Sequence, residues 1–198
     1  MGTRNLTIIF DEGEVKLAKY CQWDGYPNGQ GLTAISAINE HGNRIRRNLH
    51  LIQWSTEADI NSAIRAAHEA CGEEYEEDSP YMGWEVGQAM TRLTPLLTRD
   101  SGTIVLEHIA NATEPIVVQN MDDWRSFAED GVFCEWIWLI NFDEQRLEAY
   151  GSRDVIPEDM PQPTLYAMGV TQCRPCVGMW SFANENEINE EQFVQHWG

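Results

Sequence analysis

The residues from Trp23 to Gly31 combine aromatic, acidic and backbone-shaping side chains in a pattern typical of a ligand-binding loop. Trp23 and Tyr26 offer flat aromatic faces, and Asp24 offers acceptor oxygens and a negative charge. The glycines and the proline of the segment exclude a helix interior or a regular central strand, so we expect an exposed loop. Loops of this kind on a rigid hairpin often recognise ligands. The alternative is that both aromatic side chains fill the core while Asp24 caps the turn or the next helix.

This loop and the start of the chain resemble a largely uncharacterised protein family of bacteriophages and bacteria. The resemblance rests on Met1–Thr7 (MGTRNLT), Ala18–Tyr20, Gln22–Pro27 and Gly29–Gly31, and further on Leu97–Gly102 with the helix after it and on Phe133–Trp136 with the hairpin to Tyr150. These stretches cover about a third of the chain. Because the family has no firmly assigned activity, the resemblance implies a phage or bacterial accessory protein and little chemistry.

Several polar residues in the resembling stretches lie beside expected strand ends or helix starts. Arg4 and Arg99 are two of only 13 basic residues, and a pair of arginines in a cleft can hold a phosphate or carboxylate bidentately. An aromatic side chain of the loop would then stack on a base. The alternative is internal pairing of arginine with aspartate, which binds nothing. The predicted ligand-binding residues are Thr3, Arg4, Trp23, Asp24, Tyr26, Arg99 and Asp100, for a small anionic, nucleotide-like ligand such as a host immune signal, in a counter-defence role.

Composition and missing motifs limit the other functions. The 198 residues carry 32 acidic against 13 basic side chains, a net charge of −19, which disfavours direct binding of nucleic acid. The sequence lacks the glycine-rich nucleotide motifs, the HExxH motif and the nucleophile elbow, so we predict no catalytic residue and no cofactor. No apolar stretch approaches the ~20 residues of a membrane span, and no signal pattern is visible. We therefore expect a soluble protein of the cytoplasm, of the host cell if a phage encodes it.

The five cysteines include one CxxC motif, Cys173 to Cys176. Two thiolates at this spacing can bind a metal ion or form a redox pair. A closed zinc site needs four ligands, however, and neither a second CxxC nor a paired histidine motif is present. We therefore predict no metal site and interpret the motif as a turn with two small apolar side chains.

An acidic DNA mimic, or an inhibitor that binds a host nucleic-acid enzyme, is one alternative function. Carboxylates arranged like phosphates can block proteins that bind nucleic acids. Acidic residues cluster in 73–78 and again in 185–191. The same clusters also fit a plain solvated surface.

An N-terminal-nucleophile hydrolase is a second alternative. Removal of the first two residues would expose the α-amine of Thr3, which would then activate its own hydroxyl. Removal of Met1 alone leaves Gly2 in front of Thr3, so this function needs an additional cleavage.

Sequence patterns predict two β-hairpins, one at the start of the chain and one in its C-terminal half. Residues 6–10 and 14–21 flank a turn at Asp11–Gly13, and residues 133–142 and 147–150 flank a four-residue loop. Residues 151–179 are rich in proline and turn residues, and 189–197 predict a closing helix.

Helical patterns occupy the region between the hairpins. A stripe of Leu32, Ile35 and Ile38 predicts a helix that ends at Gly42, and Thr56 with Asp59 predicts a capped helix that ends at Gly72. We expect further helices after Ser79–Pro80, after a cap at Asp100, and around Trp124. The sequence thus predicts one α+β domain over residues 1–198, an antiparallel sheet made of both hairpins with four or five helices against it.

Overall fold

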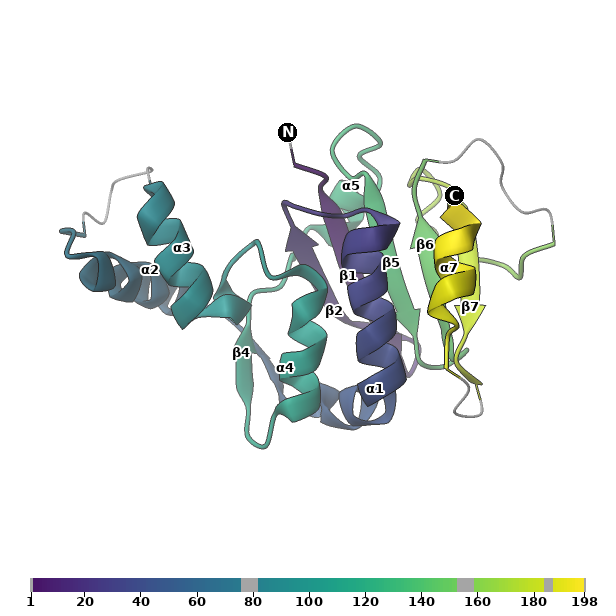
Figure 1. Cartoon of the computed structure of the whole chain (residues 1–198), viewed down its shortest axis with the longest axis horizontal. Coiled ribbons are helices and arrows are strands. Elements are labelled where there is room, and N and C mark those ends of the chain that lie inside the picture. The colour runs from purple at the N-terminus through teal and green to yellow at the C-terminus, as the bar shows by residue number, and fades with distance from the viewer. Residues whose placement is uncertain (1, 76–81, 153–158, 184–186, 198) are drawn as a thin grey trace.

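The computed structural model describes residues 2–75, 82–152, 159–183 and 187–197 and confirms the α+β class. Five strands form one mixed sheet (Figure 1). Their order across the sheet is β2 (Glu14–Cys21), β1 (Asn5–Asp11), β5 (Trp136–Asn141), β6 (Arg146–Tyr150) and β7 (Cys176–Ser181). Both predicted hairpins are present, as β1–β2 and β5–β6.

The two hairpins meet through a parallel pair of strands, whereas the sequence predicts an antiparallel sheet throughout. Asn5 pairs with Trp136 and Phe10 with Asn141 in the same direction, while the other neighbouring strands are antiparallel. The long helical connection between β2 and β5 explains the difference. It returns the chain to the end of the sheet where β1 begins, and a crossover of this length allows a parallel partner. The strand β7, in the proline-rich region, was not predicted.

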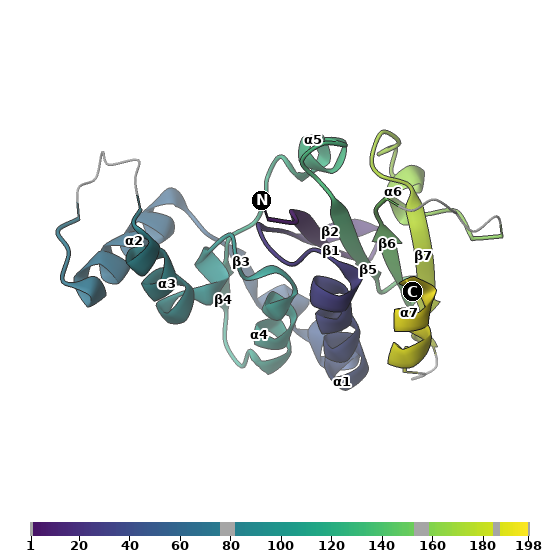
Figure 2. The ribbon, with the colours of Figure 1, turned by 45° about the horizontal axis from the view of Figure 1, so that its top comes forward.

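Helices cover both faces of the sheet (Figures 1 and 2). One face packs against α1 (Leu32–Asn48), α4 (Val105–Asn111) and α7 (Glu190–Trp197). The other face packs against α5 (Trp124–Ala128) and α6 (Thr164–Ala167). Alternate residues of each strand therefore enter two separate cores: Ile8 points toward α5 and α6, and Ile9 points toward α1.

The remaining helices, α2 (Glu57–Cys71) and α3 (Trp84–Leu93), form a hairpin to one side of the sheet (Figure 1). A small apolar cluster of their own holds them together. The predicted capping box is confirmed, because the Asp59 amide donates to Thr56 Oγ1 at 3.2 Å and the Thr56 amide donates to Asp59 Oδ2 at 2.8 Å. The helix start predicted at Ser79–Pro80 lies outside the described residues. A two-stranded parallel ladder, β3 (Ile52–Trp54) with β4 (Ile116–Val118), completes the fold.

Two predicted helix boundaries are wrong. The helix α1 continues through Gly42 to Asn48, because Ile45 and the following Leu49 keep its apolar stripe buried. Asp100 does not cap α4, which instead begins through a single 3-10 turn at Gly102–Ile104. Among the residues that the structure describes, no helix has the length and apolar character needed to cross a membrane.

Candidate functional site

The candidate site lies at the end of the sheet where β1 and β5 begin and β2 ends. The register places Asn5 opposite Cys21 on one side and opposite Trp136 on the other. The chain start, the loop at 22–31 and the turn at 130–135 therefore meet at this edge, which the label N marks in Figure 1. The Asn5 side-chain amide ties them together, because it donates to backbone oxygens of Thr3, Cys21 and Trp23 at 3.2–3.4 Å.

The loop at 22–31 is held firmly by its own backbone. The Gly25 amide donates to Thr3 O at 3.0 Å, and the Gln30 amide donates to Asp24 O at 2.9 Å. Trp138 Nε1 donates to Gly25 O at 3.0 Å from beneath the loop. A Cβ at Gly25 would lie 2.7 Å from Thr3 O, so only glycine fits this close approach. These contacts make residues 22–31 an ordered platform. The expectation of a loop without helix is wrong for Pro27–Gly31, which form one π-helical turn that runs into α1. Proline is tolerated there because it stands at the first helical position, where its missing N–H would have no partner.

The platform joins the segment before α4 through the Gln30 side chain. Gln30 Oε1 accepts hydrogen bonds from the backbone and hydroxyl of Thr103, at 2.7 and 2.6 Å. Gly102 has a φ of +50°, and a Cβ on it would collide with the Gln30 amide group. Gly102 therefore leaves room for the Gln30 side chain, whose hydrogen bonds to Thr103 hold residues 98–103 against the platform; we call this contact the Gln30 clamp.

The structure brings most of the predicted site residues to this edge, with different exposures. Trp23 and Tyr26 are about half exposed, at 47% and 49%, so neither side chain fills the core. Asp24 is exposed and adopts a left-handed backbone conformation with a φ of 54°. Thr3 is buried and contributes its carbonyl group to the loop. Asp100 is exposed, and its amide donates to Thr98 Oγ1.

The two predicted arginines are not paired with aspartate. The Arg4 guanidinium stacks on the Phe133 ring at 4.5 Å, and its buried Nε finds no hydrogen-bond partner among the residues described. Arg99 is exposed. Within the described ranges, no carboxylate lies at ion-pair distance from either guanidinium group. The internal Arg–Asp pairing that the sequence left open is therefore not formed among these residues.

Lys19 is a central residue that sequence reasoning missed. Its side chain is 1% exposed, and its Nζ donates to Thr98 O at 2.6 Å and to Leu96 O at 3.4 Å. Burial lowers the pKa of Lys19 to about 8, although negative charge at Cys21 and Asp100 opposes this effect. A buried ammonium group held only by carbonyl oxygens, without an ion-paired carboxylate, is typical of functional sites.

Lys19 belongs to a buried polar layer on the α1 face of the first hairpin. Thr7 pairs with Lys19 across the strands, and Asn5 pairs with Cys21. Asn5 Oδ1 and Thr7 Oγ1 are buried and have no hydrogen-bond partner in the described part of the chain. In the sequence these polar residues alternate with Leu6 and Ile8, a pattern that indicates a solvent-facing side of a strand. Only the helices packed on that side reveal that the polar residues are buried.

A cavity of about 190 Å³ opens beside this layer at the edge of β2. Its lining consists of Lys19, Tyr20, Arg99, Gln119, Asn120 and Met121. Burial raises the pKa of Tyr20, while the charges of Arg99 and Arg4 oppose the rise, so both arginines act on the Tyr20 hydroxyl. That hydroxyl donates to Gln22 Oε1 at 2.6 Å. The lining of the cavity therefore contains two cationic residues, Lys19 and Arg99, in a strongly acidic protein, an arrangement that can bind one anionic group.

The CxxC pair lies elsewhere, in the core beneath α5 and α6. Burial raises the pKa of Cys173 to about 11 and that of Cys176 to about 12, so both side chains are neutral thiols at pH 7. The Cys176 thiol donates to Gly178 O. No group of three or more metal-ligating side chains is found in the part of the chain that the structure describes.

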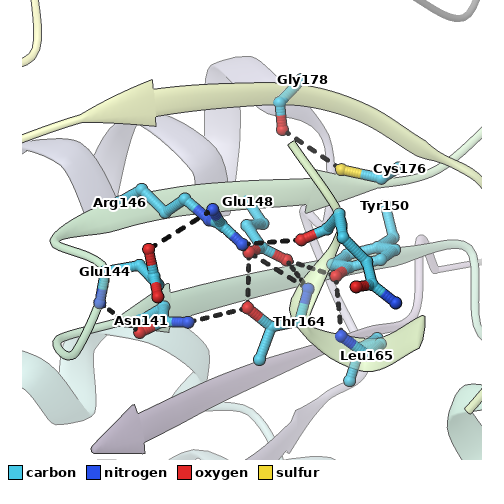
Figure 3. A network of polar contacts seen from close by, with 10 residues as sticks. Asn141, Glu144, Arg146, Glu148, Tyr150, Thr164, Leu165, Cys176 and Gly178 are labelled. Atoms are coloured by element: carbon cyan, nitrogen blue, oxygen red, sulfur yellow. Dashed lines mark hydrogen bonds and ion pairs between the residues drawn. The ribbon is translucent and has the colours of Figure 1, made fainter. Parts of the chain in front are cut away.

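A second buried charge, Glu148, pairs with Leu139 and therefore lies on the face of the sheet opposite to Lys19. Figure 3 shows the polar network around it. Its carboxylate forms an ion pair with Arg146 Nε at 2.7 Å and accepts from the Tyr150 hydroxyl. The Thr164 amide and hydroxyl also donate to it, at 2.9 and 2.6 Å. Asn141 Nδ2 donates to the Thr164 hydroxyl at 2.8 Å and completes the network. Because Glu148 has both a counter-ion and several donors, this network anchors α6 and offers no unfilled binding capacity.

No protein-family model, curated protein sequence or solved structure matches the chain.

Proposed function

We propose that the protein binds a small anionic, nucleotide-like ligand at the edge of β2, with Arg99 as the principal contact. The observation that carries the proposal is the cavity at Tyr20, where Arg99 has no carboxylate partner among the described residues and the Lys19 ammonium lies buried beside it. A guanidinium group in this position supplies planar paired donors, which suit phosphate or carboxylate. The positive charge of Lys19 adds an electrostatic attraction for the anionic group of the ligand.

The size of the cavity indicates which part of the ligand it holds. A volume of about 190 Å³ is below the ~300–1,000 Å³ of sites that enclose a whole drug-sized ligand. We therefore assign the anionic group to the cavity and the flat part of the ligand to the exposed rings of Trp23 and Tyr26. The Cys21 thiol, within 3.4 Å of Trp23 O and 3.6 Å of Asp100 O, keeps the aromatic loop beside the Arg99 segment.

Lys19 acts as a positioning residue in this proposal. Its Nζ holds the carbonyl oxygens of Leu96 and Thr98, so it fixes the segment that carries Arg99 to the edge strand. The Gln30 clamp on Thr103 fixes the same segment from the other side. Arg99 is thus presented from a rigid base, which reduces the entropy that binding must overcome.

The distribution of carboxylates favours ligand binding over DNA mimicry. Glu73 and Glu74 follow α2, on the side arm of the molecule, whereas Glu190 and Glu191 begin α7 at the opposite side (Figure 1). The described parts of the two acidic clusters therefore lie on opposite sides of the molecule and do not join into one row that imitates a DNA backbone. Binding and sequestration of a ligand by an accessory protein of a phage or bacterium, with counter-defence as its role, is our proposal for the biological function.

The hydrolase alternative has less support, because the structure packs the residue before Thr3 tightly. A Cβ on Gly2 would lie 2.6 Å from the Trp23 ring, so Gly2 is fitted against the loop.

Calorimetric titration with three probes tests the proposed function. We expect AMP and inorganic phosphate to bind and adenosine to bind much more weakly, because the anionic group supplies the main contact. Arg99→Gln should reduce the affinity for AMP about tenfold to hundredfold, corresponding to ~1.5–3 kcal/mol. Arg92→Gln, at another exposed arginine, is the matched control and should change nothing. Equal binding of AMP and adenosine, or an unchanged affinity in Arg99→Gln, would contradict the proposal.

A further inference from the structure

A groove of about 400 Å³ lies at the opposite end of the sheet from Tyr20. It runs between the second half of α1, the turn from β5 to β6, and the end of β7. Phe142 and Phe182 form its apolar wall, with their rings edge to face at 5.8 Å. The Phe142 amide donates to Phe10 O, which fixes this wall beside the β1–β2 turn. The function proposed above does not use the groove.

Gly42 keeps one wall of the groove open. It lies inside α1, where glycine is less favourable than alanine, yet a Cβ at this position would meet only Ile38 Cγ2 at 3.8 Å. Gly31 provides the contrast, because a Cβ there would lie 2.7 Å from the Trp138 ring and 3.0 Å from Phe193. Packing within the chain therefore requires Gly31, but it does not require Gly42. The missing side chain of Gly42 leaves space in the groove.

Gln145 is the reverse case, because a residue with a side chain occupies a backbone conformation that favours glycine. Its φ of 49° is left-handed, a conformation that glycine or asparagine adopts more readily. Gln145 nevertheless occupies this turn position, and it lines the groove opposite α1. Its carbonyl accepts from the Phe182 amide at 2.9 Å and holds the apolar wall in place. Such departures from local preference on both sides of one groove are typical of functional positions.

Arg44 is the cation of the groove that has binding capacity left. Its Nη2 donates to His41 Nδ1 at 2.6 Å, and its Nη1 donates to Asn111 Oδ1 at the end of α4 at 3.5 Å. Because arginine only donates, His41 must accept with the proton on Nε2. That Nε2 lies 3.6 Å from Glu40 Oε2, and Ser36 Oγ donates to the other oxygen of Glu40 at 3.1 Å. This chain of contacts orients Arg44. Arg46, in contrast, is bound to Asp11 at 2.7 Å.

We propose that this groove is a second binding site, for small aromatic carboxylates. The carboxylate accepts from the Arg44 guanidinium, and the flat ring lies in the space at Gly42 against Phe182. Glu40 and Glu187 also line the groove and repel ligands with several negative charges. The site is therefore selective for a single negative charge on an apolar ring.

Nuclear magnetic resonance titrations of the amide signals test this site with three probes at constant ionic strength: sodium benzoate, benzylammonium chloride and inorganic phosphate. We expect benzoate alone to cause saturable shifts at the amides of Gly42 and Gln145. Gly42→Leu fills the groove and should abolish these shifts. Arg44→Gln should weaken benzoate binding about tenfold or more, and Arg47→Gln on the same helix should leave it unchanged.

Three results would overturn the proposal. They are an absence of saturable shifts with benzoate, equal shifts with phosphate or benzylammonium, and benzoate binding that persists in a folded Gly42→Leu protein. Should leucine disturb the helix, Arg44→Gln keeps the test decisive, because Arg44 is exposed and its replacement leaves the core intact. Arg99→Gln serves as a further control, and benzoate binding at the groove should not depend on it.

Discussion

Lys19 and Glu148 are both charged side chains buried in the sheet, one on each face, and the structure treats them very differently. Glu148 has an arginine counter-ion, a tyrosine hydroxyl and both polar groups of Thr164 around its carboxylate. Lys19 has two backbone carbonyl oxygens and, among the residues that the structure describes, no ion-paired carboxylate, and a cavity opens beside it. Both side chains are almost fully buried, but only the charge of Glu148 is balanced by a counter-ion.

This difference is the basis on which we distinguish a structural network at Glu148 from the proposed anion-binding site at Lys19. A buried charge with a counter-ion and well-placed donors is costly to disrupt, and it has no capacity left for a ligand. A buried charge with incomplete compensation destabilises the folded protein, and an anion that enters the adjacent cavity relieves that penalty. We therefore assign Glu148 to the stability of the fold and Lys19 to the binding site.

Disruption of the Glu148 network should have the largest effect on stability. Arg146→Met leaves a buried carboxylate without its counter-ion, so we expect the free energy of unfolding to fall by about 3–5 kcal/mol. Urea unfolding followed by circular dichroism measures this loss, with Arg92→Met as the exposed control. AMP binding of the protein that remains folded should be unchanged. A loss below ~1 kcal/mol would mean that the network does not hold α6.

The pH dependence of stability should show the penalty at Lys19. Its folded pKa of about 8 is below its ordinary value of 10.5, so between these values the unfolded chain binds more protons. Stability from this residue is therefore lowest below about pH 8 and rises toward about pH 10.5, by about 3 kcal/mol. The measurement is the difference in unfolding free energy between wild type and Lys19→Met across this range, which removes contributions from other groups. A constant difference would show that Lys19 is not desolvated.

Disruption of the Gln30 clamp at Gly102 should lower both the free energy of unfolding and the affinity for AMP. Gly102→Ala forces a side chain into a left-handed position and against the Gln30 amide, so we expect a loss of about 1–3 kcal/mol and weaker AMP binding. Gly131→Ala is the matched control, because a Cβ there meets nothing within 4 Å. Equal effects of the two substitutions would remove the clamp from our description of the site.

Replacement of Trp23 should show whether its side chain contacts the ligand or only stabilises the fold. Trp23 and Trp54 are each 47% exposed, so Trp23→Ala and Trp54→Ala should both cost about 1–2 kcal/mol, less than the ~3–5 kcal/mol of a fully buried tryptophan. Only Trp23→Ala should lower the affinity for AMP, while phosphate binding stays the same. An unchanged AMP affinity would place the flat part of the ligand elsewhere.

The comparison of Lys19 with Glu148 also shows which features of the fold and of the candidate site can be predicted from the sequence alone. Turn chemistry and period-two patterns locate both hairpins, because these signals are local. The glycine-rich segment after β2 is equally visible in the sequence, and its role as a ligand-binding site stays a prediction. Lys19 and Glu148 are each part of an alternating strand pattern that indicates exposure, and only distant helices bury them. The parallel pairing of Asn5 with Trp136 is likewise set by a long connection whose path no local signal contains. The predicted helix end at Gly42 is wrong for the same reason, since burial of the residues after it is a tertiary effect.

The protein contains only two lysines, Lys16 and Lys19, which permits a direct test of the central claim. Selective isotope labelling of the lysine side chains gives two signals, whose pKa values can be followed by magnetic resonance with and without AMP. Lys16 is the internal control, because its hydrogen bond to Glu12 raises its pKa. We expect the pKa of Lys19 near 8 in the unliganded protein and clearly higher with AMP, and we expect no increase in Arg99→Gln. A Lys19 pKa close to 10.5, or one that AMP does not change, would contradict the assignment of this edge as an anion-binding site.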